Sequence, residues 1–216
     1  MPGLFVVAEG PEGAGKSTLV RALAARLVAE GRAVLPVREP GGTPVAEAAR
    51  KIVLKSPDEM TPEAELFLLH AARADLVARV IRPALEAGQV VLADRFTLST
   101  FAYQVAGRGL PQAAVAAVVA LATGGLEPDL TLVLDVPLAV GRERQRKARK
   151  GQDRIERQDD AFHSRVLAAY REARGRGVVH LDATQPRQAV LAAAWREVAT
   201  VAGLSLRGVS LRRSVS

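Results

Sequence analysis

The strongest constraint on this chain is the stretch GPEGAGKST at residues 10–18, which directly follows the apolar segment LFVVAE. A glycine, four residues, a second glycine, a lysine and a hydroxyl residue form the phosphate-loop pattern when a strand precedes it and a helix follows. Here the pattern is completed by Gly10, Gly15, Lys16 and Ser17. Because glycine admits positive φ and has no Cβ, the backbone N–H groups of such a loop can surround phosphate oxygens. A flexible glycine turn that matches by chance is the alternative interpretation.

We therefore expect the loop to bind the phosphates of a nucleotide. The helix that begins at Lys16 or Ser17 would direct the positive end of its dipole at the same anion. Lys16 would bridge the β- and γ-phosphates, and Ser17 would hold Mg²⁺. The remaining contacts to the nucleotide phosphates are expected from Gly10, Gly13, Ala14, Gly15 and Thr18.

The composition narrows the chemistry that is available. The chain has 216 residues, of which 49% are hydrophobic, as expected for one domain with a full core. No apolar run reaches the roughly 18 residues of a membrane span and the start lacks a signal-peptide pattern, so we expect a soluble, cytoplasmic protein. Cysteine is absent and the three histidines are scattered, which excludes thiolate metal sites and argues against a histidine-built zinc site. A metal is expected on oxygen ligands.

The net charge of +7 is concentrated in two segments. Residues 142–157 carry eight basic and three acidic side chains, and the tail at 203–216 adds three arginines and no acidic residue. The remainder of the chain is close to neutral. Local positive charge of this kind suits a compact polyanion such as a nucleotide better than nucleic acid, which we do not expect as a partner. A solvated helix face is the simpler alternative for residues 142–157.

Short, apolar, β-branched segments alternate with longer segments of helical period, which predicts an α/β fold with a parallel sheet. Residues 1–202 are expected to form one domain, and the tail at 203–216 is expected to be frayed. Pro36 favours an edge position for its strand. The predicted strands are 4–9, 33–39, 89–95, 129–136 and 177–183, and the predicted helices are 17–31, 43–55, 61–88 with a bend or break near Pro83, and 110–125.

Three classes of phosphate-loop protein compete. A guanine-nucleotide switch requires an Asn-Lys-x-Asp signature, and this chain contains no asparagine. A motor or nucleic-acid ATPase is disfavoured because no obvious apolar run ends in Asp-Glu. A small-molecule kinase needs a second substrate site and a means of excluding water from the γ-phosphate, and the remaining motifs offer both.

These motifs resemble thymidylate kinase, a family of nucleoside-monophosphate kinases, from about residue 4 to residue 200. Aspartate-arginine followed by ST and AYQ at this spacing is far more specific than a phosphate loop alone. In family order, the motifs are GPEGAGKS, REPGGT at 38–43, HAAR at 70–73, DRFTLSTFAYQ at 94–104, PDLTLVLDV at 128–136, DRIE at 153–156 and DATQP at 182–186.

The resemblance implies a P-loop kinase fold, a three-layer sandwich whose five-stranded parallel sheet is flanked by helices, with a small basic lid at about 142–157. It implies that the protein transfers a phosphoryl group from ATP to dTMP, with Mg²⁺ as cofactor, and so forms dTDP. It also implies a homodimer that is packed through a helix like that at 112–122. The residues assigned to dTMP are Glu12, Leu69, Arg73, Arg95, Ser99, Thr100, Tyr103 and Gln104.

Within that set, each side chain has an implied role. Arg95 would bind the acceptor monophosphate, Glu12 would hold the sugar 3′-hydroxyl, and Tyr103 would crowd the 2′ position. The base would be read by Arg73, Thr100 and Gln104, which together offer donors and an acceptor to O4 and N3–H. For Thr100 alone, a helix cap is the alternative.

The resemblance also implies the residues of the phosphoryl-transfer centre. Asp94 would orient water on Mg²⁺ or a phosphate-binding arginine at the carboxyl edge of the sheet. A strand-end ion pair is the alternative for Asp94 and Arg95, and a surface salt bridge is the alternative for Arg38 and Glu39. The complete catalytic set is Lys16, Arg38, Glu39, Asp94, Arg95, Arg149 and Arg154.

Two positions decide how the family pattern applies. Some members carry an arginine in the phosphate loop where this chain has Gly13, so here the lid must supply the positive charge; Arg149 and Arg154 are favoured among Arg142, Arg144, Arg146, Arg149 and Arg154. Ala183 and Gln185 lie in the loop that resembles the adenine site.

The family usually has phenylalanine where this chain has Leu69, and Phe67 would point to another side of the helix.

The leading hypothesis is thus a thymidylate kinase. A nucleoside-monophosphate kinase of relaxed base choice is the first alternative, because Leu69 removes ring stacking on the base. A P-loop regulatory or nucleic-acid ATPase is the alternative from a different class, because of the basic tail.

Overall fold

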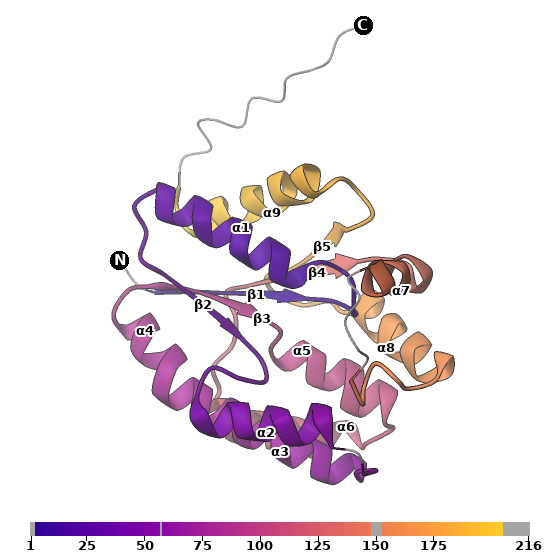
Figure 1. The fold of residues 1–216 in the computed structure, drawn as a ribbon. Helices are drawn as coiled ribbons and strands as arrows, with labels where there is room; N and C mark the ends of the chain where they lie inside the picture. The colour runs from indigo at the N-terminus through magenta and orange to yellow at the C-terminus, as the bar shows by residue number, and fades with distance from the viewer. Residues whose placement is uncertain (1–2, 57, 148–152, 205–216) are drawn as a thin grey trace, which may run out of the picture.

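The computed structural model describes residues 3–56, 58–147 and 153–204. Its centre is a sheet of five strands in the order β2-β3-β1-β4-β5, and every neighbouring pair is parallel (Figure 1). The predicted α/β class and five-stranded parallel sheet are confirmed, and Pro36 lies on an edge strand as expected. The strands are β1 (Leu4–Glu9), β2 (Val34–Arg38), β3 (Val90–Asp94), β4 (Leu130–Asp135) and β5 (Val178–Asp182).

Helices cover both faces of the sheet, which gives three layers (Figure 1). One face packs against α1 (Lys16–Ala29) and α9 (Arg187–Val201), and the other packs against α4, α8 and the π-helical segments that precede α4 and follow α5. On that second face the elements are α2 (Pro44–Lys55), α3 (Pro62–Leu76), the π-helical η1 (Val77–Ile81), α4 (Arg82–Glu86), α5 (Thr97–Thr100), the π-helical η2 (Phe101–Gly107), α6 (Gln112–Thr123) and α8 (Asp160–Glu172). The remaining helix, α7 (Leu138–Lys147), follows β4 and lies against α8.

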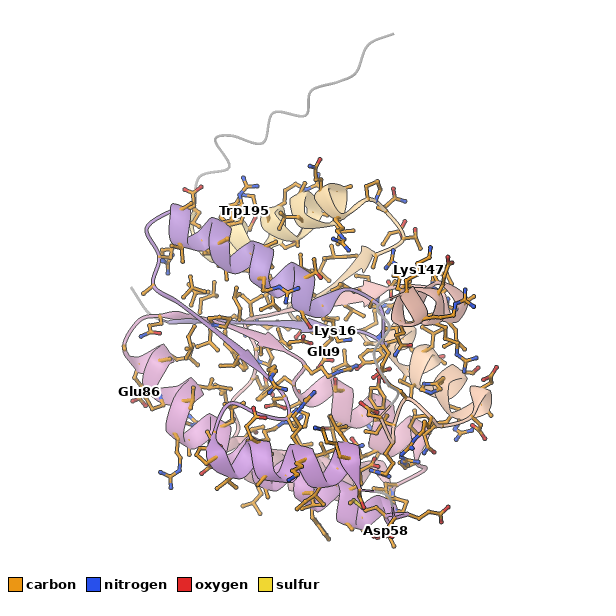
Figure 2. All side chains as sticks on the ribbon, in the orientation of Figure 1. Glu9, Lys16, Asp58, Glu86, Lys147 and Trp195 are labelled. Atoms are coloured by element: carbon orange, nitrogen blue, oxygen red, sulfur yellow. The ribbon has the colours of Figure 1, made fainter. Side chains whose placement is uncertain are left out.

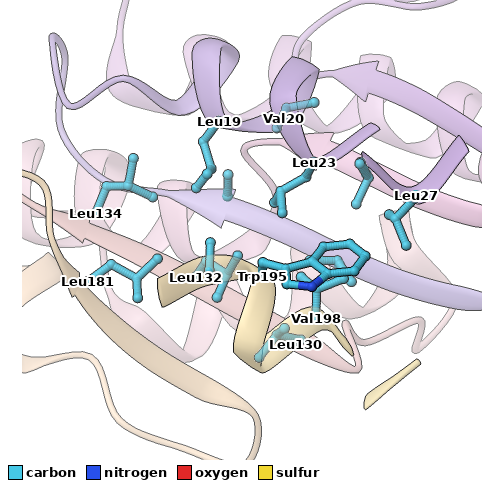
Figure 3. Close-up of a cluster of buried hydrophobic side chains, with 14 of the residues drawn as sticks. Leu19, Val20, Leu23, Leu27, Leu130, Leu132, Leu134, Leu181, Trp195 and Val198 are labelled. Atoms are coloured by element: carbon cyan, nitrogen blue, oxygen red, sulfur yellow. The ribbon is translucent and has the colours of Figure 1, made fainter. Parts of the chain in front are cut away.

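The larger part of the hydrophobic core lies between the sheet and the pair α1 and α9 (Figure 3). Leu23 and Leu27 of α1 face Leu132 of β4 and Trp195 of α9, and all four side chains are almost completely buried. Burying a side chain of this size contributes about 1.5–3 kcal/mol. This layer holds α1 rigidly against the sheet, and α1 begins at the phosphate loop.

The helix predicted over residues 61–88 is instead three consecutive segments, α3, η1 and α4. Pro83 lies in the first turn of α4 and has no N–H to donate, so the chain widens into a π-helical segment before it. The sequence prediction also omitted α5, α7, α8 and α9. The basic segment, expected as a lid, is helical up to Lys147, and residues 148–152 lie outside the described part of the chain.

Among the described residues, no helix combines the length and apolar character that are needed to cross a membrane.

Candidate active site

A cavity of about 2000 Å³ opens where the strands end, between the phosphate loop, α3, α5 and α7. Figure 2 shows Lys16 near the middle of the molecule and Lys147 on α7 at its side. Of the predicted residues, Gly10 and Arg154 do not line this cavity, and Arg149 lies outside the described residues. Those that do line it are Glu12, Gly13, Ala14, Gly15, Lys16, Ser17, Thr18, Arg38, Glu39, Leu69, Arg73, Asp94, Arg95, Ser99, Thr100, Tyr103, Gln104, Ala183 and Gln185.

The phosphate loop joins β1 to α1 and has the conformation that its glycines were expected to allow. Gly10, Gly13 and Gly15 have φ values of 135°, 73° and 100°, which lie in the region that favours glycine. Lys16 Nζ turns back onto the loop and donates to the carbonyl oxygens of Gly10 at 2.9 Å and Pro11 at 2.7 Å. Burial, and then the nearby Arg95, lower the pKa of Lys16 to about 8.

Ser17 and Asp94 bring two oxygen donors together from different elements. The Ser17 hydroxyl at the start of α1 donates to an Asp94 carboxylate oxygen at the end of β3. A hydroxyl and a carboxylate are hard oxygen ligands of the kind that Mg²⁺ prefers, usually with several waters retained. The described residues contain no group of three or more His, Cys, Asp or Glu side chains placed to hold a metal ion. The chemistry of the Ser17 and Asp94 oxygens fits Mg²⁺ as one part of a larger set of oxygen ligands.

Among the described cations of the site, Arg95 donates the largest number of hydrogen bonds. It is the only residue other than glycine with positive φ among those described, at 77°, and its side chain lies over the Tyr103 ring. Its guanidinium donates to Glu12 Oε1 at 2.8 Å, Tyr170 Oη at 2.9 Å, and Gly10 O and Ser99 Oγ at 3.1 Å. A backbone strain of this kind costs about 1–3 kcal/mol and persists because the surrounding contacts hold it.

Glu12 stays ionised between these cations. Burial by itself raises the pKa of the carboxyl, but Arg95 and Lys16 outweigh burial and lower it below its usual value. The second carboxylate oxygen accepts from the Tyr103 hydroxyl. A carboxylate inside a phosphate loop is thus balanced by one lysine and one arginine, each of which can also bind a phosphate.

Arg73 lies at the floor of the cavity and is fully bound. Its Nε donates to Glu39 Oε2 at 2.7 Å, and its Nη atoms donate to Thr100 Oγ1 at 2.8 Å, Phe96 O at 3.0 Å and His70 Nε2 at 3.0 Å. His70 Nδ1 faces the Leu66 carbonyl and carries the proton, so Nε2 is the acceptor. Burial, then Arg73, lower the pKa of His70 to about 4, so the ring is neutral near pH 7.

The comparisons with known proteins agree with this geometry. The family model described as thymidylate kinase matches residues 8–194. The chain belongs to the thymidylate kinase family. A thymidylate kinase of Pseudomonas fluorescens is 52% identical over 190 residues, which cover 86% of this chain and 90% of the relative. One of Deinococcus radiodurans is 47% identical over 200 residues, which cover 91% of this chain and 96% of the relative. Thymidylate kinases phosphorylate dTMP to dTDP, and they are phosphotransferases that use ATP.

The structure shows the surroundings of three residues to which the family resemblance gives a role: Arg38, Glu39 and Leu69. Arg38 forms the surface ion pair that was the simpler alternative, because its Nη2 donates to both Glu47 carboxylate oxygens at 2.8 and 3.0 Å. Glu39 instead points inward to Arg73, and burial raises its pKa more than Arg73 lowers it. Leu69 lines the cavity while Phe67 is 59% exposed, so the two side chains lie on different sides of α3 as expected.

Of the two favoured lid arginines, Arg149 lies outside the described residues and Arg154 contacts other protein groups. Arg154 does not reach the cavity wall, because its guanidinium binds Glu65 and donates to the Val53 carbonyl at 2.8 Å. Arg144, which was not favoured, lies against the phosphate loop and donates to Ala183 O at 2.9 Å and Gly13 O at 3.4 Å. A residue count along the lid could not show this, because α7 turns Arg144 towards the loop.

Gly13 is the contact point between the phosphate loop and α7. A Cβ placed there would lie 2.2 Å from the Gly141 carbonyl oxygen. Since φ is also positive at Gly13, an arginine at this position would displace α7 or the loop. The close approach gives a structural reason for Gly13 that the sequence could not show.

Sequence reasoning missed Glu9, which organises the Arg95 side of the site. The fully buried Glu9 carboxylate at the end of β1 accepts from Phe96 N at 2.8 Å, Ser99 N at 3.0 Å and Ser99 Oγ at 2.6 Å. It also accepts from Tyr170 Oη at 3.2 Å. An acidic residue at the end of a buried strand was the available signal, because a buried charge requires partners.

Proposed function

We propose that this protein transfers the γ-phosphoryl group of ATP to dTMP. The observation that carries this proposal is that Lys16 and Arg95 both donate to the carbonyl oxygen of Gly10, at 2.9 and 3.1 Å. Two cations that converge on one oxygen, inside one cavity, suit two phosphate groups that must meet for transfer. The family to which the chain belongs supplies the identity of the two substrates.

The chemistry assigned to the protein is positioning and charge neutralisation. The attacking oxygen belongs to a phosphate that is already ionised near neutral pH, so no general base is needed. Lys16 would leave the loop carbonyls to bind the γ-phosphate, and Arg95 would bind the acceptor phosphate while Glu12 holds the sugar 3′-hydroxyl. Ser17 and Asp94 would hold Mg²⁺, which neutralises the donor phosphates when it is bound.

The lid would close the donor side. Arg144 is already beside the phosphate loop, and Arg149 remains a candidate for the transferred group. Ala183 and Gln185 would contact the adenine side of ATP, because both line the cavity near Arg144. Because the Arg154 guanidinium is hydrogen-bonded to Glu65 and to the Val53 carbonyl, it would hold the end of the lid rather than contact the phosphates.

A steady-state assay of ADP release tests the proposal. Purified protein with ATP and Mg²⁺ is given dTMP, dUMP, UMP, CMP, AMP or GMP separately, and we expect a strong preference for dTMP. Similar turnover on several monophosphates would support a kinase of relaxed base choice, which Leu69 favours. ATP hydrolysis that does not depend on any acceptor would support the ATPase alternative, and deletion of residues 203–216 would then abolish nucleic-acid binding.

We also propose a cytoplasmic homodimer whose subunits each contain one domain at residues 1–202. The support lies in large apolar side chains exposed on neighbouring helices, Ile52 on α2, Phe67 on α3 and Leu121 on α6, which are 49%, 59% and 86% exposed. Sedimentation equilibrium should give twice the mass of the chain, and Leu121→Asp should shift the protein to monomer. A wild-type mass equal to that of one chain contradicts the dimer.

A further inference from the structure

The side chain of Glu65 on α3 joins the dTMP side of the cavity to the end of the lid. It is 1% exposed, and its Oε1 accepts from Gln104 Nε2 at 2.8 Å and from Arg108 Nε at 3.2 Å. Its Oε2 accepts from Arg108 Nη2 at 2.9 Å and from Arg154 Nη2. Burial raises the pKa of Glu65, but Arg108, Arg154 and Gln104 together lower it below the usual value, so the carboxyl is ionised.

An ionised carboxylate determines which way the Gln104 amide points. A carboxylate only accepts hydrogen bonds, so the amide group that faces it must be the NH₂ and not the carbonyl. The planar amide then directs Gln104 Oε1 away from Glu65. That oxygen accepts no hydrogen bond from the described residues, and Gln104 lines the cavity.

The Gln104 oxygen must be reachable from the cavity. Within the described residues, the fully enclosed side-chain atoms without a hydrogen-bond partner are Glu39 Oε1, Asp75 Oδ2 and Asp135 Oδ1. Gln104 Oε1 is not among them although the residue is only 1% exposed. Gln104 Oε1 can thus accept a hydrogen bond from a base that occupies this part of the cavity.

An acceptor at this place distinguishes two kinds of pyrimidine. Thymine and uracil carry an N–H at ring position 3, whereas cytosine has a lone pair there. We propose that Glu65 is a positioning residue that makes the site select a base with an N3–H over cytosine, by holding the Gln104 carbonyl towards the base. The inference rests on the proposed function, because it takes a pyrimidine monophosphate as the occupant of the cavity.

The variant Glu65→Gln tests this directly. Its new amide should place the carbonyl towards the charged Nη2 groups of Arg108 and Arg154, and its NH₂ towards Gln104. The Gln104 amide can then rotate and present NH₂ to the base. We expect the ratio of kcat/KM for dTMP to kcat/KM for dCMP to fall about tenfold, with the dTMP value lower and the dCMP value higher, since one hydrogen bond is exchanged between the two bases.

A matched control separates positioning from general destabilisation. Arg108→Lys disturbs the same cluster, and Arg108 also contacts Gln158 at 2.7 Å and the Phe162 ring at 4.7 Å. The carboxylate and its hydrogen bond to Gln104 remain in this variant. We expect a lower melting temperature with an unchanged dTMP to dCMP ratio. An equal change of the ratio in both variants overturns the inference.

A double-mutant cycle with Gln104→Leu completes the test. Gln104→Leu should lower the ratio at least as much as Glu65→Gln, and the double variant should show no further loss, because Glu65 acts through Gln104. Additive losses overturn the inference. If Glu65→Gln does not fold, Gln104→Leu alone decides, and an unchanged ratio there is a contradiction. Wild-type protein that does not phosphorylate dTMP overturns the proposed function instead, whatever the variants do.

Discussion

The donor side and the acceptor side of the cavity are built in different ways. The proposed donor side is one contiguous loop, whose glycines and backbone groups would bind the phosphates and whose Lys16 side chain donates to the carbonyls of Gly10 and Pro11. The proposed acceptor side is a network of buried side chains from β1, α3, α5, η2 and α8 and from the residues that follow β2 and β3. A local backbone site depends on a few adjacent residues, whereas a network depends on every element that contributes a partner.

This difference has an energetic consequence. Removing one member of a buried ion pair leaves the other charge without compensation in a medium of low polarity. Removing the phosphate-loop lysine should cost less stability, because its ammonium group donates to neutral carbonyls and the nearby Glu12 carboxylate keeps its ion pair with Arg95. We therefore expect acceptor-side substitutions to reduce the stability of the protein and donor-side substitutions to reduce its activity.

The largest effect is expected for Arg73→Met. The side chains of Arg73 and Glu39 are each 5% exposed and 2.6 Å apart, so the variant leaves a buried carboxylate and should lose about 3–5 kcal/mol in the free energy of unfolding by urea. The burial of Glu39 already raises its pKa, so the unpaired group should take up a proton on folding, and the loss should shrink from pH 7 to pH 5.

A matched control lies in η1, the segment that directly continues α3. Arg79 pairs with Asp75 at 2.6 Å but is 73% exposed. Arg79→Met should change stability little. If the two variants lose equal stability, the acceptor side is not the tightly coupled network that its contacts indicate.

Lys16→Met should be the strongest donor-side variant. It removes the positive charge that we propose for the transferred phosphate, and we expect kcat to fall by about 10² to 10³-fold. The urea midpoint should stay close to that of the wild type. Lys51→Met, which changes an exposed lysine of α2, serves as the control and should keep the wild-type kcat. A large loss of stability in Lys16→Met would remove the contrast between the two sides.

The pH dependence of ATP binding tests the lowered pKa of Lys16 on the donor side. With the pKa of Lys16 lowered to about 8, the lysine of the free protein loses its proton above that pH, whereas bound phosphates favour the charged form. Binding must then take up a proton, so the affinity for ATP should fall by up to about tenfold per pH unit above pH 8. Calorimetry at pH 9 in two buffers of different ionisation enthalpy measures this uptake. An affinity that is constant from pH 7 to 9 contradicts the shifted pKa.

The smallest effect on stability is expected for Arg38→Ala. Arg38 and Glu47 form an ion pair whose side chains are 49% and 46% exposed, and such pairs contribute about 1 kcal/mol or less. The unfolding midpoint should hardly move, even though Arg38 lines the same cavity as Arg73. A change in kcat without a change in stability would show that Arg38 acts on the phosphates, as the family resemblance implies.

The fold was predictable where local signals were strong. Each of the five strands is a short apolar segment bounded by turn residues, and each was expected within one or two residues of its observed position. The π-helical segments were not predictable, because they arise where Pro83 interrupts a long helix and where η2 continues α5. The contact between Arg154 and Glu65 was not predictable either, because the two residues are 89 positions apart in the sequence.

The sequence by itself determined the phosphate loop, the strand that leads into it and the family of the chain, because these depend on adjacent residues at fixed spacing. Only the tertiary structure decided that Glu9 supports Arg95, that Gly13 must be small because it contacts Gly141, and that Glu65 holds Gln104. Such partners are distant in the sequence and are brought together when the sheet and its helices bury them. A buried polar group must then find a partner wherever the fold supplies one.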